Sequence, residues 1–354
     1  MNTKFLSTAI GSMPFDDAQK AVEVSLNMLD APIWPQLPRL GLLEQMEVQY
    51  SEGLPCAVVD SEKSRMYFQT GKDYSEDFAV FYEQYMAAFD PDEGDGDCSS
   101  MAISQTYSKG IYALEKALQG KGKLPWLKVQ TTGPCSFALT IVDENKRAIY
   151  YNEEFRDVIV KAMAMKCRWQ LQKFAPFADN LICFIDEPIL SAFGSSTYVS
   201  VNREDVVAIL AEVIDAVHAE NALAGIHCCG NTEWSILIDA GVDIVNFDAF
   251  GYGETIAMYP EAVKKHLENG NFLAWGVVPT SKEIREQTVE SLEAQLEKVM
   301  DHLAAQDIDK GMIARQAILT PSCGTGSLDP EDAQMVFTLL NGLSKRMKEK
   351  YFGN

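Results

Sequence analysis

The sequence lacks the features that mark membrane-spanning and secreted proteins. No apolar run among the 354 residues is long enough to cross a bilayer, and the first six residues contain no secretory apolar core. Eight cysteines are spread along the chain without the dense, regular spacing of a secreted disulfide scaffold. We therefore expect reduced thiols and a cytoplasmic location.

Basic residues are scarce relative to acidic ones. Lys and Arg number 30 against 51 Asp and Glu, which gives a formal net charge of −21. Nucleic acids and anionic membranes both attract basic surfaces, so this balance argues against either as a partner. Apolar residues make up 47% of the chain, enough for a substantial core. We expect a soluble, acidic, globular protein.

Short apolar, strand-like runs recur along the chain with helix-length segments between them. Eight buried strands that alternate with helices predict a parallel (β/α)8 TIM barrel. The pattern G-x-G-x-x-G follows none of these runs, which weakens the alternative of a dinucleotide-binding, doubly wound sheet. The expected strands are residues 7–12, 33–38, 126–131, 181–186, 224–228, 243–247, 272–277 and 317–320.

The chain is expected to form one domain over residues 1–354. Residues 39–125 depart from the simple alternation, and we expect them to form an excursion of helices and loops between the second and third strands. The second strand, residues 33–38, is rich in proline, which is unfavourable within a regular sheet. We expect it to be short and to end in a loop.

A histidine and several cysteines stand at the ends of the predicted strands. Because side chains on a strand alternate between its faces, His227 and Cys229 should point the same way and Cys228 away from them. Asp248 follows the next strand and Cys323 follows the last. An imidazole, two thiolates and a carboxylate at one rim predict a zinc site with an exchangeable position. The alternative is a set of buried cysteines beside a core histidine.

Other polar residues stand at the same expected rim. In TIM barrels the reactive residues lie at the C-terminal ends of the strands. Here those ends also carry Ser12 and the sequence Asp186-Glu187-Pro188. Either could be explained alone, as a helix cap or a turn residue. Together with the predicted metal ligands they indicate a functional site.

Five short motifs follow one another along the chain: Ile10-Gly11-Ser12, Thr132-Gly133-Pro134, Asp186-Glu187-Pro188, His227-x-Cys229 and Pro321-Ser322-Cys323-Gly324. In type and order they resemble the catalytic half of cobalamin-independent methionine synthase. The wider group includes uroporphyrinogen decarboxylase-like barrels and methylcobamide:thiol methyltransferases. The resemblance implies a zinc-dependent methyltransferase in methionine biosynthesis, with homocysteine as the expected acceptor.

The resemblance also implies roles for individual residues. His227, Cys229 and Cys323 correspond to zinc ligands, and Asp248 stands where the synthase carries a glutamate ligand that is one methylene longer. The residues that would hold the amino-acid part of homocysteine are Ser12, Glu44 and Asp186, with Glu47 as a competitor for the place of Glu44.

The residue types suit thiol chemistry independently of the resemblance. A thiol is a weak nucleophile until it ionises, with an ordinary pKa of about 8.5, and zinc stabilises the thiolate at neutral pH. Two cysteine thiolates would cancel the charge of the ion, so that a substrate sulfur retains electron density. A weak oxygen ligand can leave when that sulfur arrives.

The methyl donor is where the resemblance and the length of the chain diverge. The synthase has a second, N-terminal barrel that contributes to binding its folate donor, and 354 residues are too few to contain it. We therefore expect a corrinoid, free or on a carrier protein, as the donor. The alternatives are another thiol as acceptor, a non-catalytic zinc barrel, and a uroporphyrinogen decarboxylase-like enzyme, which would need basic residues and no zinc.

Overall fold

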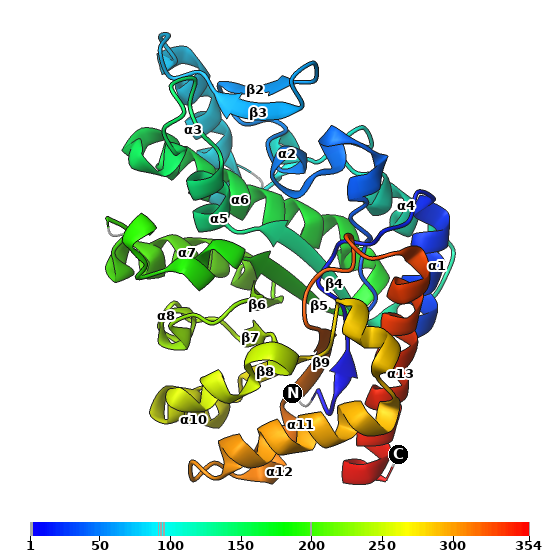
Figure 1. The fold of residues 1–354 in the computed structure, drawn as a ribbon. Coiled ribbons are helices and arrows are strands. Elements are labelled where there is room, and N and C mark those ends of the chain that lie inside the picture. The colour runs from blue at the N-terminus through cyan, green and yellow to red at the C-terminus, as the bar shows by residue number, and fades with distance from the viewer. Residues whose placement is uncertain (1–2, 91, 93, 95, 199, 354) are drawn as a thin grey trace.

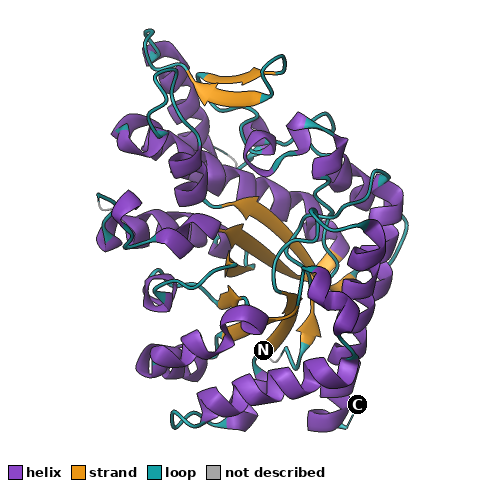
Figure 2. Ribbon diagram, viewed as in Figure 1, coloured by secondary structure: helices purple, strands orange, loops and turns teal. Residues whose placement is uncertain are grey.

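The computed structural model describes residues 3–90, 92, 94, 96–198 and 200–353. A curled, parallel sheet lies at its centre, and helices surround it (Figures 1 and 2). The sheet contains β1 (Leu6–Ser7), β4 (Leu124–Thr132), β5 (Ala178–Asp186), β6 (Leu223–Cys228), β7 (Ile244–Phe247), β8 (Phe272–Val278) and β9 (Ala317–Pro321). Its seven strands are arranged in the order β1-β9-β8-β7-β6-β5-β4. The predicted α/β class with a parallel sheet is confirmed.

Helices connect successive strands and cover the outer face of the sheet (Figure 1). The α-helices outside the excursion are α1 (Ala18–Met28), α5 (Pro134–Thr140), α6 (Glu153–Phe174), α7 (Arg203–His218), α8 (Trp234–Asp239), α9 (Ala249–Tyr252), α10 (Pro260–Glu268), α11 (Val289–Ala304), α12 (Lys310–Arg315) and α13 (Pro330–Phe352). Single 3-10 turns are η4 (Ile149–Tyr151), η5 (Ala175–Phe177), η6 (Pro188–Ala192), η7 (Ser196–Tyr198), η8 (Gly253–Met258) and η9 (Lys282–Glu286). Within the described ranges, each helix is too short or too polar to span a membrane.

Apolar side chains form two clusters, one on each face of the sheet. The inner cluster contains Leu6, Ile10, Ala31, Ile182, Phe184, Ile244, Phe272, Ala274 and Ile318. The larger cluster packs the outer face against the helices. Along β5, Ile182 and Phe184 belong to the inner cluster, whereas Cys183 and Ile185 belong to the outer one. By the same alternation, Asp186 points inward at the C-terminal end of the strand.

The predicted closed barrel of eight strands is wrong in one respect, because the second expected strand is not a regular strand. Residues 33–38 form only isolated bridges, one between Ile33 and Lys128 and one between Gln36 and Ser12. Prolines 32, 35 and 38 lack the N–H groups that a ladder needs, so regular pairing cannot extend through them. The sheet is a half-barrel whose open side is spanned by an irregular segment.

Polar contacts from inside the barrel hold this irregular segment between β1 and β4. The Lys128 ammonium donates to the Ile10 carbonyl at 2.7 Å and to Gln130 Oε1 at 3.3 Å. The Gln130 amide donates to the Trp34 carbonyl at 2.9 Å. Lys128 is fully buried, and its Nζ also lies 4.4 Å from the centre of the Phe184 ring. Two side chains of β4 therefore bind carbonyls that a regular strand would have paired with backbone N–H groups.

The predicted excursion contains more regular structure than expected. It comprises η1 (Pro38–Leu40), η2 (Leu42–Glu44), α2 (Met46–Gln49), β2 (Ala57–Asp60), β3 (Arg65–Phe68), α3 (Ser75–Phe89), η3 (Ser99–Met101) and α4 (Lys109–Leu118). Strands β2 and β3 form an antiparallel hairpin that lies beyond α6 from the main sheet (Figure 1). The buried Lys166 of α6 donates to the carbonyls of Glu52 and Met101, which ties the excursion to the barrel.

The buried Lys128 should make stability depend on pH in the alkaline range. Burial lowers its pKa from 10.5 to about 8. Between these values the unfolded chain binds more protons at this residue than the folded chain, so stability rises with pH across the window. Relative to Lys128→Met, the free energy of unfolding of the wild type should increase by up to about 3 kcal/mol between about pH 8 and pH 10.5.

Urea unfolding of both proteins over this range measures the difference. Lys166, whose pKa is also lowered to about 8, is present in both proteins and cancels. A difference between wild type and variant that does not change with pH would contradict the account of Lys128 as a desolvated cation.

Candidate metal centre

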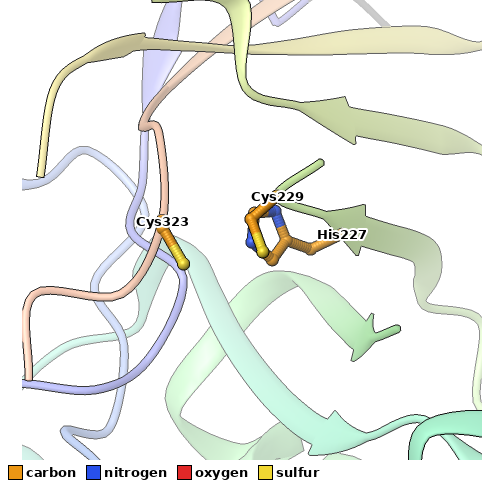
Figure 3. Close-up of side chains that lie close together, drawn as sticks. All are labelled: His227, Cys229 and Cys323. Carbon is orange, nitrogen blue, oxygen red and sulfur yellow. The ribbon is translucent and has the colours of Figure 1, made fainter. Parts of the chain in front are cut away.

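His227, Cys229 and Cys323 converge at the C-terminal rim of the sheet. His227 lies on β6, Cys229 directly follows that strand, and Cys323 lies two residues beyond β9. Their ligand atoms all lie within 4.8 Å of one another. Figure 3 shows the two sulfur atoms and the imidazole directed toward one region. The structure thus brings together three of the four ligands that the sequence predicts.

The neighbouring Cys228 behaves as strand alternation predicts. Its side chain is fully buried in the outer apolar cluster, and its thiol donates to the Gly230 carbonyl at 3.6 Å. Burial raises the pKa of this thiol to about 12, so it stays protonated. Cys228 is therefore a core residue beside the site.

The two cysteines of the cluster lie close enough to influence each other's ionisation. The neighbouring Cys323 thiol holds the pKa of Cys229 well below its ordinary value, and the imidazole of His227 acts in the same direction. The proximity of Cys229 raises the pKa of Cys323. A cation at this position would favour the ionised form of both sulfur atoms.

His227 presents one nitrogen to the cluster and has a partner on the other. Its Nδ1 lies 2.6 Å from Oδ1 of Asn246 on the adjacent strand β7. Nε2 is buried and makes no hydrogen bond within the described chain. A buried imidazole nitrogen without a partner is the group that a metal ion would satisfy.

Asp248, the predicted fourth ligand, is outside the group of three. It is half-buried directly after β7, and its Oδ1 accepts the Gly251 N–H at 2.8 Å as the N-cap of α9. Burial raises the pKa of this carboxyl. Asp248 thus lies at the predicted rim but is engaged with the helix, which leaves the fourth position of the cluster open.

This donor set fits zinc. One imidazole nitrogen and two thiolates bind Zn²⁺ well, and three protein ligands with an open fourth position are typical of catalytic rather than structural zinc sites. All three side chains line a cavity of about 480 Å³, so the open position faces space for a substrate.

Asp186 lines the same cavity and has an unused acceptor. It is paired in register with His227, so the two side chains point inward at the same level of neighbouring strands. Its Oδ1 is buried without a hydrogen-bond partner in the described residues. Burial raises the pKa of Asp186 to about 6, against the opposing effect of His227 and Lys128. At neutral pH it is therefore a carboxylate available to a cationic group.

Ser12 also lines the cavity, where it is held by the loop that carries Cys323. Its hydroxyl accepts the Gly326 N–H at 3.2 Å, and its carbonyl accepts from the N–H and hydroxyl of Thr325. A Cβ at residue 324 would lie only 2.2 Å from the Ser12 hydroxyl, so this close approach requires Gly324.

The two competing glutamates lie in different surroundings. Glu44 is buried, and its carboxylate accepts the Lys109 N–H at 2.9 Å and the Gln49 amide at 3.4 Å. It therefore links the excursion to the start of α4. Glu47 lines the cavity together with Tyr50.

The motifs Thr132-Gly133-Pro134 and Asp186-Glu187-Pro188 bind each other. The buried Glu187 carboxylate accepts hydrogen bonds from the Cys135 and Ser136 N–H groups and from the Ser136 hydroxyl at the start of α5. A Cβ at Gly133 would lie 2.1 Å from the Glu187 side chain. Glu187 thus positions the end of β5, and with it Asp186, without lining the cavity itself.

Sequence reasoning missed Asn246 and the polar residues of β4. The alternation of side chains along a strand could have identified Asn246. It stands two residues before Asp248, on the same face, and is an amide within an otherwise apolar strand. Gln130 likewise alternates with Thr132 on the inward face of β4. A polar residue at an inward position near the end of a barrel strand should be weighed together with the predicted ligands.

No protein-family model matches this chain, and no curated protein matches its sequence. Among solved structures, it is similar to a B12-independent methionine synthase from Shewanella sp. W3-18-1, determined in complex with selenomethionine. The TM-score is 0.47 with 14% sequence identity, and the match covers 70% of this chain and 67% of that chain. A similarity of this degree assigns neither family nor activity, so the functional conclusion depends on the residues of the site.

The cluster predicts one bound zinc ion per chain and a specific pattern of loss. Cys229→Ser and Cys323→Ser should each lose most of the zinc, because a neutral hydroxyl is a much weaker ligand than a thiolate. Cys228→Ser is the matched control and should retain it, since this side chain faces the outer core. Elemental analysis of the purified proteins measures the zinc content per chain. An unchanged zinc content in both Cys229→Ser and Cys323→Ser would disprove the ligand set.

Proposed function

We propose that this chain is a zinc-dependent methyltransferase that methylates the sulfur of a small thiol, with homocysteine as the leading acceptor. The observation that carries the proposal is the convergence of His227, Cys229 and Cys323 on the wall of a cavity, with the fourth ligand position open toward it. Such a position is where a substrate sulfur would enter.

Each member of the cluster has a role in this proposal. Zinc, when bound, would supply a Lewis acid that lowers the pKa of the substrate thiol toward neutrality. His227 would hold the ion through Nε2, and the two cysteine sulfurs would give the site two negative charges. Those charges would leave the metal site nearly neutral, so that a substrate sulfur would retain electron density for attack on a methyl group.

The acidic side chains that line the cavity suit the amino group of an amino-acid thiol. Asp186 offers a buried, unpartnered carboxylate oxygen, and Glu47 adds a second negative charge. The Ser12 hydroxyl also lines the cavity, next to the loop that carries Cys323. A charge-assisted hydrogen bond from an ammonium group would satisfy Asp186 and orient the thiol toward the metal ligands.

The charges of the cavity also separate this proposal from a decarboxylase of polycarboxylate substrates. Lysine and arginine are absent from the residues that line the cavity in the described parts of the chain, whereas Glu47 and Asp186 are both acidic. A substrate with many carboxylates would meet repulsion here rather than ion pairs. The geometry therefore favours a zwitterionic or cationic thiol over a uroporphyrinogen-like substrate.

The identity of the methyl donor stays a prediction. The expectation of a corrinoid, free or on a carrier protein, rests on the sequence resemblance, and no described contact distinguishes it from methyl-tetrahydrofolate. The donor is best identified by direct assay.

The zinc-loaded protein should form methionine from homocysteine when supplied with a suitable methyl donor. Methylcobalamin, methyl-tetrahydrofolate and simple methylated compounds are tested separately, and we expect turnover with methylcobalamin. Turnover with the folate alone would disprove the corrinoid donor and leave the acceptor chemistry intact. Failure with every donor, despite bound zinc, would contradict the proposed acceptor.

Asp186→Asn provides the matched test of the acceptor site. Loss of a charged hydrogen-bond acceptor should raise KM for homocysteine about 10- to 100-fold, which corresponds to roughly 1.5–3 kcal/mol. For a thiol of similar length without an amino group, wild type and variant should give similar KM values. Equal zinc content in the two proteins confirms that the effect is on the substrate, and an unchanged KM for homocysteine would remove Asp186 from the acceptor site.

A further inference from the structure

Asn246 lies beside the metal ligands without being one. It is fully buried on β7, paired in register with His227 on one side and with Ala274 on the other. We propose that Asn246 is a positioning residue that fixes the tautomer and the ring orientation of His227, so that Nε2 is directed to the metal. This inference depends on the proposed metal site and extends it beyond the ligands themselves.

The hydrogen bonds of Asn246 determine which end of its amide faces the histidine. Its Nδ2 donates to the Ala274 carbonyl and to the Thr320 hydroxyl, each at 2.9 Å. The Ala274 carbonyl can only accept, so the group bound to it must be the amide nitrogen. Both amide hydrogens are then used, and Oδ1 is the atom that remains for His227.

The orientation of Asn246 in turn determines the tautomer of His227. An amide oxygen only accepts, so the 2.6 Å contact requires the proton on Nδ1 of the imidazole. In the neutral ring, Nε2 then carries the lone pair. This is the buried nitrogen without a partner, so it is the nitrogen left to bind a metal in the three-residue cluster. The contact with Asn246 therefore leaves the Nε2 lone pair available for a metal ion in the metal-free protein.

Asn246 also connects the two parts of the chain that supply the ligands. Thr320, which accepts from its amide, is fully buried on β9, three residues before Cys323. His227 lies on β6, and Asn246 bridges the two strands from β7. One side chain thus holds the histidine and contacts the strand that leads to the second cysteine.

Removal of the acceptor should alter the imidazole in a way that general destabilisation would not. In Asn246→Leu, a side chain of similar size leaves Nδ1 without a partner and allows the Nε2–H tautomer, whose proton blocks the metal position. Outer-shell partners of this kind contribute about 10- to 100-fold to metal affinity. Asn246→Asp keeps an acceptor of the same shape for the Nδ1 proton but lacks the donors to Ala274 and Thr320, so it is the control that retains only the contact to His227.

The experiment combines tautomer and affinity measurements. ¹⁵N NMR of the metal-free wild type, in which only four histidines occur, should show His227 protonated on Nδ1. Zinc affinity, measured by competition with a chelator, should fall about 10- to 100-fold in Asn246→Leu and stay within a few-fold of wild type in Asn246→Asp. Thr320→Val should cause a smaller loss, because the amide keeps its bond to the Ala274 carbonyl.

Two results would overturn the inference. One is a wild-type His227 protonated on Nε2, and this result is decisive even if Asn246→Leu fails to fold. The other is a folded Asn246→Leu protein that binds zinc as tightly as the wild type. If the wild type itself binds no zinc, the proposed function is wrong, whereas a zinc-binding wild type with an equally competent Asn246→Leu variant overturns only the positioning role.

Discussion

The parallel register of β5, β6 and β7 is the constraint on which the site depends. It sets Asp186, His227 and Asn246 side by side at one level of the sheet, all on its inner face. Because parallel strands end at the same edge of the sheet, residues that are distant in sequence come together at one rim. A slip of one residue in β6 would turn His227 outward and place Cys228 in the cavity.

Two kinds of polar side chain surround one cavity at the rim. Strand β6 and the loop after β9 supply an imidazole and two thiols. The carboxyl of Asp186 lies beside His227, and the Ser12 hydroxyl lies against the loop that carries Cys323. Soft donors suit zinc, and charged oxygens suit an ammonium group. The half-barrel holds these residues together although its eighth position lacks a regular strand.

The interior below the cavity contains buried polar side chains. Lys128 and Gln130 are buried there and hold the carbonyls of Ile10 and Trp34. These contacts bring the segment that carries Ser12 against β4, so the polar interior supports the part of the cavity that Ser12 lines. A buried cation beneath Asp186 also favours the ionised form of that carboxyl.

Strand periodicity explains how much of the site could be predicted from the sequence. The alternation of His227, Cys228 and Cys229 depends only on local geometry, so the inward direction of the first and third side chains and the outward direction of Cys228 could be predicted. Asp248 was placed at the correct rim, but its engagement as a helix cap depends on the backbone of the following turn.

The remaining differences depend on long-range packing. The burial of Glu44 depends on the position of α4, because the Lys109 N–H at the start of that helix donates to its carboxylate. The prolines of residues 33–38 indicated that this segment would not form a regular strand. The role of the buried Lys128 beside it could be recognised only from the contacts of β4.

X-ray absorption at the zinc edge of the metal-loaded protein tests the central claim most directly. The account predicts two sulfur ligands at about 2.3 Å together with nitrogen or oxygen ligands, and a third sulfur after homocysteine is added. A first shell without sulfur, or one that homocysteine does not change, would contradict it.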